Sequence, residues 1–268
     1  MRRPTALLLL LGLATAPSFA ADPPRRILSA NLCADRLVLA LAEPGTVISV
    51  SLFAADPEAS TVVDQTAGLI LNHGDAEEIA ALHPDLAVFG SFAGSAADLV
   101  EKLGIPVYRL PVPDDLAGMR SAILTLASRL GVPARGDRLV AEIDRRLASM
   151  RRPHGPTRVA ITSAGGWTHG RHTIDDEILG ALGVDNLASL AGVSGIGNLP
   201  LEALIALQPA LIVVEGLGLD RPSLRAHSLS HPVLRDAGIR RLEMPMKLWA
   251  CADAALLDGA QLIADALP

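Results

Sequence analysis

In the first part of the chain, short apolar runs alternate with segments whose apolar residues recur at helical spacing. The runs that predict strands are Arg25–Ser29, Val47–Val50, Leu86–Phe89 and Val107–Leu110. The segments that predict helices are Ala34–Ala42, Glu77–Leu82 and Ala96–Leu103. This order of strands and helices predicts an α/β fold in which a parallel or mixed sheet is flanked by helices.

The pattern changes in the middle of the chain, where two consecutive segments predict helices and no strand lies between them. The first runs from Asp114 or Asp115, each a natural N-cap, to Leu130, and the second from Ala134 to Met150. The second helix would be about 25 Å long, at about 1.5 Å per residue, which is enough to cross between two lobes. The breaker Arg152–Pro156 ends it.

Alternation resumes in the last part of the chain, and part of it repeats the first. Strands are predicted at Val159–Thr162, Leu211–Val214 and Arg240–Met244. Helices are predicted at Asp175–Leu182, Leu201–Leu207 and Ser223–Ser228, with a last one from Asp253. The segment EEIAALHPDLAVF matches EALIALQPALIVV at an offset of 125 positions, which places Pro84 on Pro209 and Glu77 on Glu202.

Helix, turn and buried strand recur in many α/β proteins, but here a proline and a glutamate seven residues before it also recur in register. The repeat therefore predicts two similar lobes. We expect an N-terminal lobe over residues 22–113, a helical connector with the inter-lobe helix over 114–153, and a C-terminal lobe over 154–268.

Residues 1–21 have the pattern of a secretory signal peptide. Arg2 and Arg3 precede the apolar run Ala6–Leu13, and small residues lie around Ser18 and Ala20. The apolar run is shorter than the roughly 20 residues that span a bilayer, and no cysteine follows the expected cleavage point. We therefore expect a protein that is soluble in the periplasm after cleavage.

The net charge of −6 argues against a polyanionic partner, so nucleic acid is not expected. Signatures of the common enzyme classes are also missing, since the chain has no GxSxG, HExxH or P-loop motif. We predict that the protein is not an enzyme. The alternative is a periplasmic enzyme or a ligand-sensing receptor on the same two-lobed fold.

The chain resembles the ABC importer substrate-binding proteins for ferric siderophores, haem and cobalamin, whose lobes are joined by one rigid helix. The resemblance covers the whole mature chain and rests on ILSANLCADRLVLAL, LNHGDAEEIAALHPDLAVFGSF, KLGIPVYRLP, the long connecting helix and NLPLEALIALQPALIVVEG. It implies a monomer that captures a metal chelate between its lobes and delivers it to an ABC permease and its ATPase. No cofactor is implied beyond the metal of the ligand, and a helical hinge implies little lobe closure.

In that family, a glutamate before the ALxP turn of each lobe pairs with arginines of the permease. Glu77 and Glu202 occupy these positions, and exposed carboxylates on both lobes suit charge-assisted docking to a symmetric permease. The alternative is that both are ordinary first-turn glutamates favoured by the helix dipole.

Ligands of open α/β sheets lie beyond the carboxyl ends of the strands, so the loops that follow the strands are the candidates for the cleft. Four of the chain's few aromatic side chains fall in these loops and offer flat apolar faces to a chelate. The alternative is that they plug the ends of the cores. The predicted ligand-binding residues are Asn31, Cys33, Phe53, Ser91, Phe92, Trp167, His169, Glu215, Lys247, Trp249 and Cys251.

Two points about these loops stay open at the level of sequence. Under the resemblance Cys33 and Cys251 lie in cleft-facing loops of opposite lobes, where they form either a disulfide that pins the lobes or two free thiols near the ligand. His73 and His169 are candidate metal ligands, but no HxH, HxxxH or paired carboxylate cluster accompanies them. We therefore predict no bare-metal site, and His169 is alternatively a counter-charge for an acidic chelate.

Overall fold

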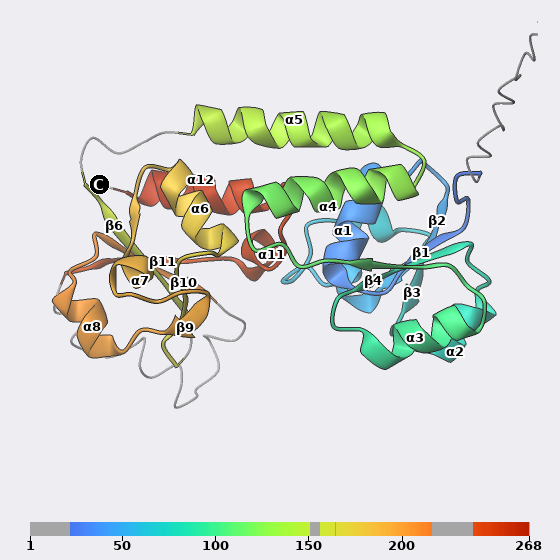
Figure 1. Ribbon diagram of the computed structural model, residues 1–268, viewed down its shortest axis with the longest axis horizontal. Coiled ribbons are helices and arrows are strands. Elements are labelled where there is room, and N and C mark those ends of the chain that lie inside the picture. Colours follow the sequence, from blue (N-terminus) through green and yellow to red (C-terminus); the bar gives the residue numbers. More distant parts are fainter. Residues whose placement is uncertain (1–21, 151–155, 164, 216–237, 268) are drawn as a thin grey trace, which may run out of the picture.

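The computed structural model describes residues 22–150, 156–163, 165–215 and 238–267. Two α/β lobes lie side by side, and helix α5 (Pro133–Ser149) runs along both of them (Figure 1). The predicted signal peptide and the predicted helix Ser223–Ser228 lie outside the described residues. Within the described part of the chain, no helix has the length and apolar character needed to cross a membrane.

The N-terminal lobe is built on a five-stranded sheet in which all neighbouring strands are parallel, in the order β3-β2-β1-β4-β5. Its strands are β1 (Ile27–Ser29), β2 (Val47–Ser51), β3 (Ile70–Asn72), β4 (Leu86–Gly90) and β5 (Val107–Leu110). Its helices are α1 (Leu32–Leu41), α2 (Ala76–Ala81) and α3 (Gly94–Lys102), with 3-10 turns η1 (Leu52–Ala55) and η2 (Val63–Thr66). The sequence pattern missed β3 because Ile70 and Leu71 are exposed on this short edge strand.

The C-terminal lobe has a four-stranded parallel sheet in the order β11-β10-β6-β8 and an antiparallel pair, β7 with β9. These strands are β6 (Arg158–Ser163), β7 (Trp167–His169), β8 (Asp185–Asn186), β9 (Ile196–Asn198), β10 (Leu211–Glu215) and β11 (Arg240–Glu243). The helices are α6 (Ile174–Ala181), α7 (Leu187–Leu190), α8 (Leu201–Ala206), α11 (Met246–Trp249) and α12 (Leu256–Ala266). The predicted α/β class with helix-flanked parallel sheets is confirmed.

Two helix starts show how local polar groups set the boundaries. Asp115 is the N-cap of α4 (Leu116–Arg129), because its carboxylate accepts a hydrogen bond from the Gly118 N–H. The last helix begins at Leu256 and not at the predicted Asp253. The Asp253 carboxylate instead accepts the Ala255 N–H and pairs with Arg36 of the other lobe, so it holds the chain ahead of the helix.

The internal repeat holds in three dimensions with the register that the sequence predicts. Helix α2 and strand β4 have the same bounds as α8 and β10 at an offset of 125 positions. The residue before each proline has a left-handed backbone, with φ of 46° at His83 and 48° at Gln208. In the N-terminal lobe, Arg26 precedes the first strand and donates to the carbonyl of Leu82 at the end of α2. In the C-terminal lobe, Arg158 lies in the first strand and donates to the carbonyl of Leu207 at the end of α8. Glu77 and Glu202 therefore lie in the first turns of equivalent helices.

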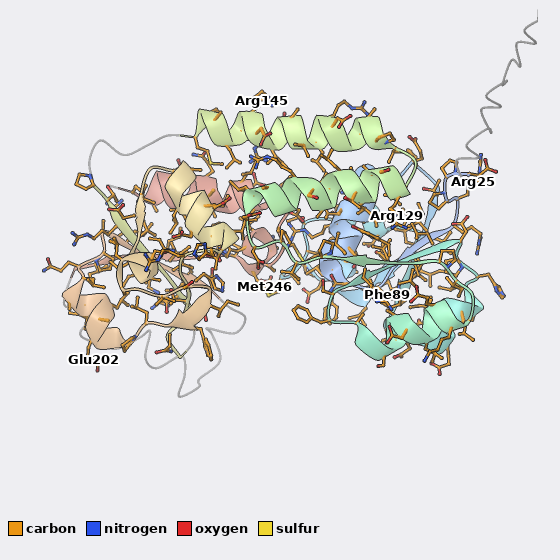
Figure 2. All side chains as sticks on the ribbon, viewed as in Figure 1. Arg25, Phe89, Arg129, Arg145, Glu202 and Met246 are labelled. Atoms are coloured by element: carbon orange, nitrogen blue, oxygen red, sulfur yellow. A yellow bond between two sulfur atoms is a disulfide. The ribbon has the colours of Figure 1, made fainter. Side chains whose placement is uncertain are left out.

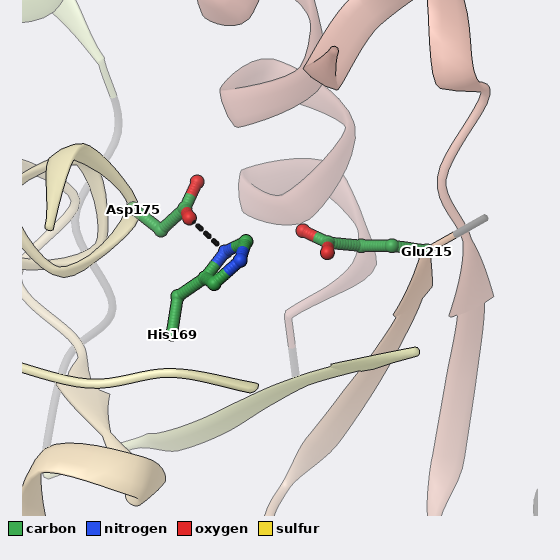
Figure 3. Close-up of side chains that lie close together, drawn as sticks. All are labelled: His169, Asp175 and Glu215. Carbon is green, nitrogen blue, oxygen red and sulfur yellow. Dashed lines mark ion pairs between the residues drawn. The ribbon is translucent and has the colours of Figure 1, made fainter. Parts of the chain in front are cut away.

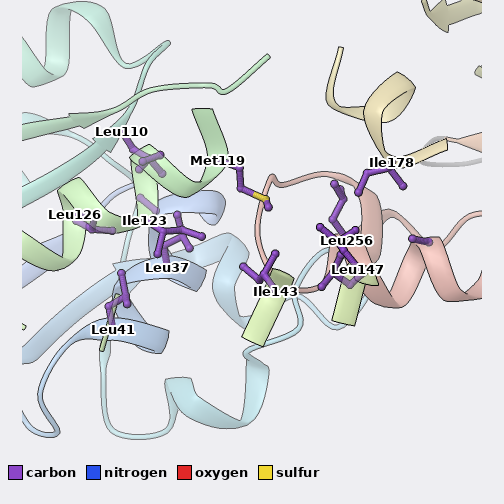
Figure 4. Close-up of a cluster of buried hydrophobic side chains, with 14 of the residues drawn as sticks. Leu37, Leu41, Leu110, Met119, Ile123, Leu126, Ile143, Leu147, Ile178 and Leu256 are labelled. Carbon is purple, nitrogen blue, oxygen red and sulfur yellow. The ribbon is translucent and has the colours of Figure 1, made fainter. Parts of the chain in front are cut away.

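One hydrophobic core runs through both lobes. It joins α1 of the N-terminal lobe to α4 and α5 and continues into α6, α12 and the second sheet (Figure 4). Fully or almost fully buried side chains along this path include Leu37, Leu41, Met119, Ile123, Leu126, Ile143, Leu147, Ile178 and Leu256. Because interiors are close-packed, a shared core of this kind resists the bending of one lobe against the other.

A buried carboxyl group joins the ends of β1 and β2 to α1. Asp35 is fully buried, and its carboxylate accepts hydrogen bonds from the Ser29 and Ser51 hydroxyls and from the Ser51 N–H. Burial raises the pKa of Asp35 to about 6, and the hydrogen bonds from Ser29 and Ser51 oppose that rise. The folded protein thus binds a proton at Asp35 more tightly than the unfolded chain does.

This buried group predicts how stability depends on pH. The stability that Asp35 contributes is fully present below the unfolded-state pKa of 3.8 and is lost as the pH rises to the folded-state pKa of about 6. In Asp35→Asn, the side-chain amide can still form hydrogen bonds with Ser29 and Ser51, but it does not titrate in this pH range. The free energy of unfolding of the variant relative to the wild type should therefore rise by about 2 kcal/mol between pH 4 and 6.

Urea unfolding of both proteins across that pH range measures the difference. Asp64 is exposed, so Asp64→Asn serves as the matched control and should run parallel to the wild type. Parallel curves for Asp35→Asn as well would contradict the assignment.

Candidate ligand cavity between the lobes

Three bonds join the first helix of the N-terminal lobe to the segment before α12 in the C-terminal lobe. The Arg36 guanidinium lies 2.7 Å from the Asp253 carboxylate, and these side chains are only 2% and 8% exposed. The same guanidinium donates to the Lys247 carbonyl oxygen at 2.8 Å. One turn earlier, Cys33 forms a disulfide with Cys251, with a Cα–Cα distance of 5.3 Å. The lobes are thus held together covalently and ionically beside the candidate site.

A cavity of about 320 Å³ lies next to the disulfide and between the lobes. Its N-terminal wall consists of Asn31, Cys33 and Leu37 on and before α1, residues 90–92 at the end of β4, residues 110–113 at the end of β5, and Ala122 of α4. Its C-terminal wall consists of residues 250–252. None of these lining residues carries a charge, and most of them are apolar.

Large apolar side chains are exposed on both lobes. Phe92 lines the cavity and is 94% exposed, and Val112 beside it is also exposed. Outside the cavity, Phe53 in η1 and Trp167 in β7 are 54% and 52% exposed. Phe92 and Val112 therefore leave exposed apolar surface at the cavity, whereas single exposed apolar residues elsewhere are ordinary in folded proteins.

The structure brings part of the predicted ligand-binding set to the cavity. The predicted residues that line it are Asn31, Cys33, Ser91, Phe92 and Cys251. Phe53 and Trp167 are surface residues outside its lining. The Lys247 ammonium reaches the other lobe, where it donates to the Pro57 carbonyl oxygen at 3.5 Å. The remaining members, His169, Glu215 and Trp249, gather elsewhere in the C-terminal lobe.

His169 and Glu215 form a cluster with Asp175, which is not among the residues predicted from the sequence. The ends of β7 and β10 supply His169 and Glu215, and the first turn of α6 supplies Asp175, with Thr173 as the helix cap. Asp175 forms an ion pair with His169 Nδ1, and Glu215 faces the imidazole from the other side (Figure 3).

Burial and the nearby Asp175 carboxylate raise the pKa of Glu215 to about 7, whereas His169 lowers it. The Trp249 indole also lowers this pKa, although Trp249 Nε1 and Glu215 Oε1 make no hydrogen bond of normal geometry. Pairing with Asp175 raises the pKa of His169. The other candidate histidine, His73, is exposed in the N-terminal lobe, where it pairs with Glu78 at 3.4 Å.

Sequence reasoning missed several residues of the cavity, above all the segment 110–113. The signal for it was present, because this segment directly follows the predicted strand Val107–Leu110 and so obeys the rule that selected the other loops. Leu37 and Ala122 had no such signal, since an apolar residue on a helix is indistinguishable in sequence from an ordinary core residue.

The two predicted docking glutamates lie in equivalent places on the two lobes. Both side chains are exposed, at the starts of α2 and α8. These helices lie on the side of the molecule opposite α5, one at each end (Figure 1), and Figure 2 shows Glu202 at that edge of the C-terminal lobe.

Two similar α/β lobes with a cavity between them define a two-lobed binding protein. The family model of the periplasmic binding proteins matches residues 27–237, which is most of the chain. The protein therefore belongs to the periplasmic binding protein family.

Solved structures share this fold over nearly their full length. The periplasmic haem-binding protein HutB of Vibrio cholerae has a TM-score of 0.75 at 21% identity, covering 90% of this chain and 97% of that one. The periplasmic haem-binding protein RhuT of Roseiflexus sp. RS-1 has a TM-score of 0.70 at 24% identity, with the same two coverages. The periplasmic vitamin B12-binding protein BtuF of Vibrio cholerae has a TM-score of 0.62 at 17% identity, covering 91% of this chain and 96% of that one. No curated protein matches the sequence.

Proposed function

We propose that this protein is the substrate-binding protein of an ABC importer and that it carries a metal chelate with a largely apolar surface, either haem or a corrinoid. The observation that carries the proposal is the uncharged cavity between the lobes. The structural neighbours that bind haem and vitamin B12 support the same class of ligand. The protein would be exported by its signal peptide, act as a monomer and bind its ligand without turnover.

The chemistry of the cavity favours a tetrapyrrole over an anionic ferric siderophore. A charged chelate that enters an apolar site loses its hydration, and this loss is unfavourable unless cations replace the water. The described lining residues provide no such cation. The faces of a haem or corrinoid macrocycle are apolar and gain free energy when they and the exposed Phe92 ring leave water together, while the propionates of haem lie at the ring edge and can stay in water.

The metal of the chelate would receive no ligand from these walls. The described lining contains no histidine, tyrosine or methionine, and both of its cysteine sulfurs are used in the disulfide. This composition suits a chelate whose coordination is already complete, as in a corrinoid that carries its own axial base.

Absorbance titrations of the purified protein with haem, cyanocobalamin and a ferric catecholate siderophore test the proposal. We expect haem or cyanocobalamin to bind at micromolar concentration or tighter, to be recovered unchanged, and to bind more tightly than the siderophore. Ala250 lines the cavity and is exposed, so Ala250→Trp should occupy part of it and weaken binding by about tenfold or more.

Ala148→Trp, on the exposed face of α5, is the matched control and should bind like the wild type. The proposal fails if none of the chelates binds at micromolar concentration, or if Ala250→Trp binds as tightly as the control.

The docking role of Glu77 and Glu202 leads to a separate prediction. The variant Glu77→Ala with Glu202→Ala should lose most chelate uptake in proteoliposomes that contain the permease and ATPase, because both carboxylates would pair with permease arginines. Its affinity for the chelate should stay unchanged, since neither residue lines the cavity.

Glu58→Ala, which removes another exposed glutamate, should transport normally. Lower chelate affinity in the double variant would instead assign Glu77 and Glu202 to binding, and normal uptake would remove their docking role.

A further inference from the structure

We infer that His169, Asp175 and Glu215 form a binding site for a divalent first-row transition-metal ion inside the C-terminal lobe. One ligand atom of each side chain lies within 4.8 Å of the others. None of the three lines the cavity between the lobes. The ion would therefore be a resident ion of the lobe, bound independently of the proposed chelate.

The donor set matches this class of metal ion. One imidazole and two carboxylates neutralise a divalent cation and combine nitrogen with oxygen donors, which suits zinc, cobalt and related ions. Calcium and magnesium are a poorer match, because they take six or more ligands that are almost all oxygen.

The cluster also contains buried polar atoms that have no hydrogen-bond partner among the described residues. Two of the five buried side-chain atoms without a hydrogen-bond partner in the described part of the chain are candidate ligand atoms here, His169 Nδ1 and Glu215 Oε1. Trp249 Nε1 is a third such atom in the cluster, but it carries an N–H donor and would not contact the ion. His169 Nδ1 does contact Asp175, but as an ion pair without hydrogen-bond alignment. In the described residues no lysine or arginine pairs with Glu215 or Asp175. A metal ion would supply the missing partner of the Glu215 carboxylate.

The three side chains come from separate elements of the lobe. His169 ends a strand of the β7–β9 pair, Asp175 lies in the first turn of α6, and Glu215 ends the central strand β10 (Figure 3). An ion bound to all three would tie the β7–β9 pair and α6 to the main sheet. Metal binding would therefore appear as added stability of the folded protein.

Calorimetric titration of tag-free, EDTA-treated mature protein with zinc chloride tests the site. We expect one ion per chain, and a melting temperature that rises with zinc concentration. His169→Ala, Glu215→Gln and Asp175→Asn should each lower zinc affinity by about tenfold or more. The exposed pair of His73 with Glu78 gives the matched control, because His73→Ala should leave zinc affinity unchanged.

Two readouts on the wild type keep the test decisive if a variant fails to fold. Bound cobalt should give visible d–d absorption, and zinc should protect His169 from modification by diethyl pyrocarbonate, as read by mass spectrometry. The inference is overturned if the wild type binds no stoichiometric zinc at micromolar concentration, if zinc leaves His169 reactive, or if folded variants bind zinc like the wild type. Chelate titration of the same samples is a separate readout, so loss of one binding activity does not imply loss of the other.

Discussion

The buried ion pair between Arg36 and Asp253 is the contact on which the relation between the lobes depends. Its partners come from opposite lobes and are almost fully shielded from water. Removal of one partner from such a pair leaves an unpaired buried charge, which costs about 3–5 kcal/mol. The Cys33–Cys251 disulfide lies one helical turn away and joins the same two segments, so that the ionic and covalent links reinforce each other.

Other features of the molecule follow from this fixed arrangement. The cavity has walls from both lobes and includes the disulfide itself, so its shape exists before a ligand arrives. The shared core and α5 also hold the lobes in this arrangement, since each connects the lobes on the side away from α2 and α8 (Figure 1). A ligand that enters a preformed site loses less free energy to ordering of the protein. Glu77 and Glu202 lie on the same two lobes, so this arrangement would also fix their separation.

The repeat could be predicted from the sequence because each of its two copies is a short continuous segment. Pro84 and Pro209, with the apolar residues around them, define a helix, a turn and a buried strand over a few consecutive residues, and the structure has the same register. A left-handed residue stands before the proline in both lobes. The edge strand β3 was not predicted because a strand is recognised in sequence by the apolar pattern of its buried face, and β3 is short and mostly exposed.

Long-range pairs could not be predicted in this way. Arg36 and Asp253 are 217 positions apart, and neither belongs to a recognisable motif. His169, Asp175 and Glu215 meet only because the ends of β7 and β10 converge on α6, so their spacing in the sequence carries no metal signature. The disulfide was one of two alternatives until the folded backbone brought the cysteines together. Such contacts are set by tertiary packing.

The central claim is that the lobes are locked and the cavity is preformed. Spin labels on the exposed faces of α3 and α8, introduced as Ser95→Cys with Ala206→Cys, allow the distance between the lobes to be measured by double electron–electron resonance. The native cysteines are both used in the disulfide and do not interfere. Saturation with the bound chelate should leave a single narrow distance that shifts by about 1 Å or less. A shift of several ångströms, or a broad distribution that narrows on binding, would contradict the account.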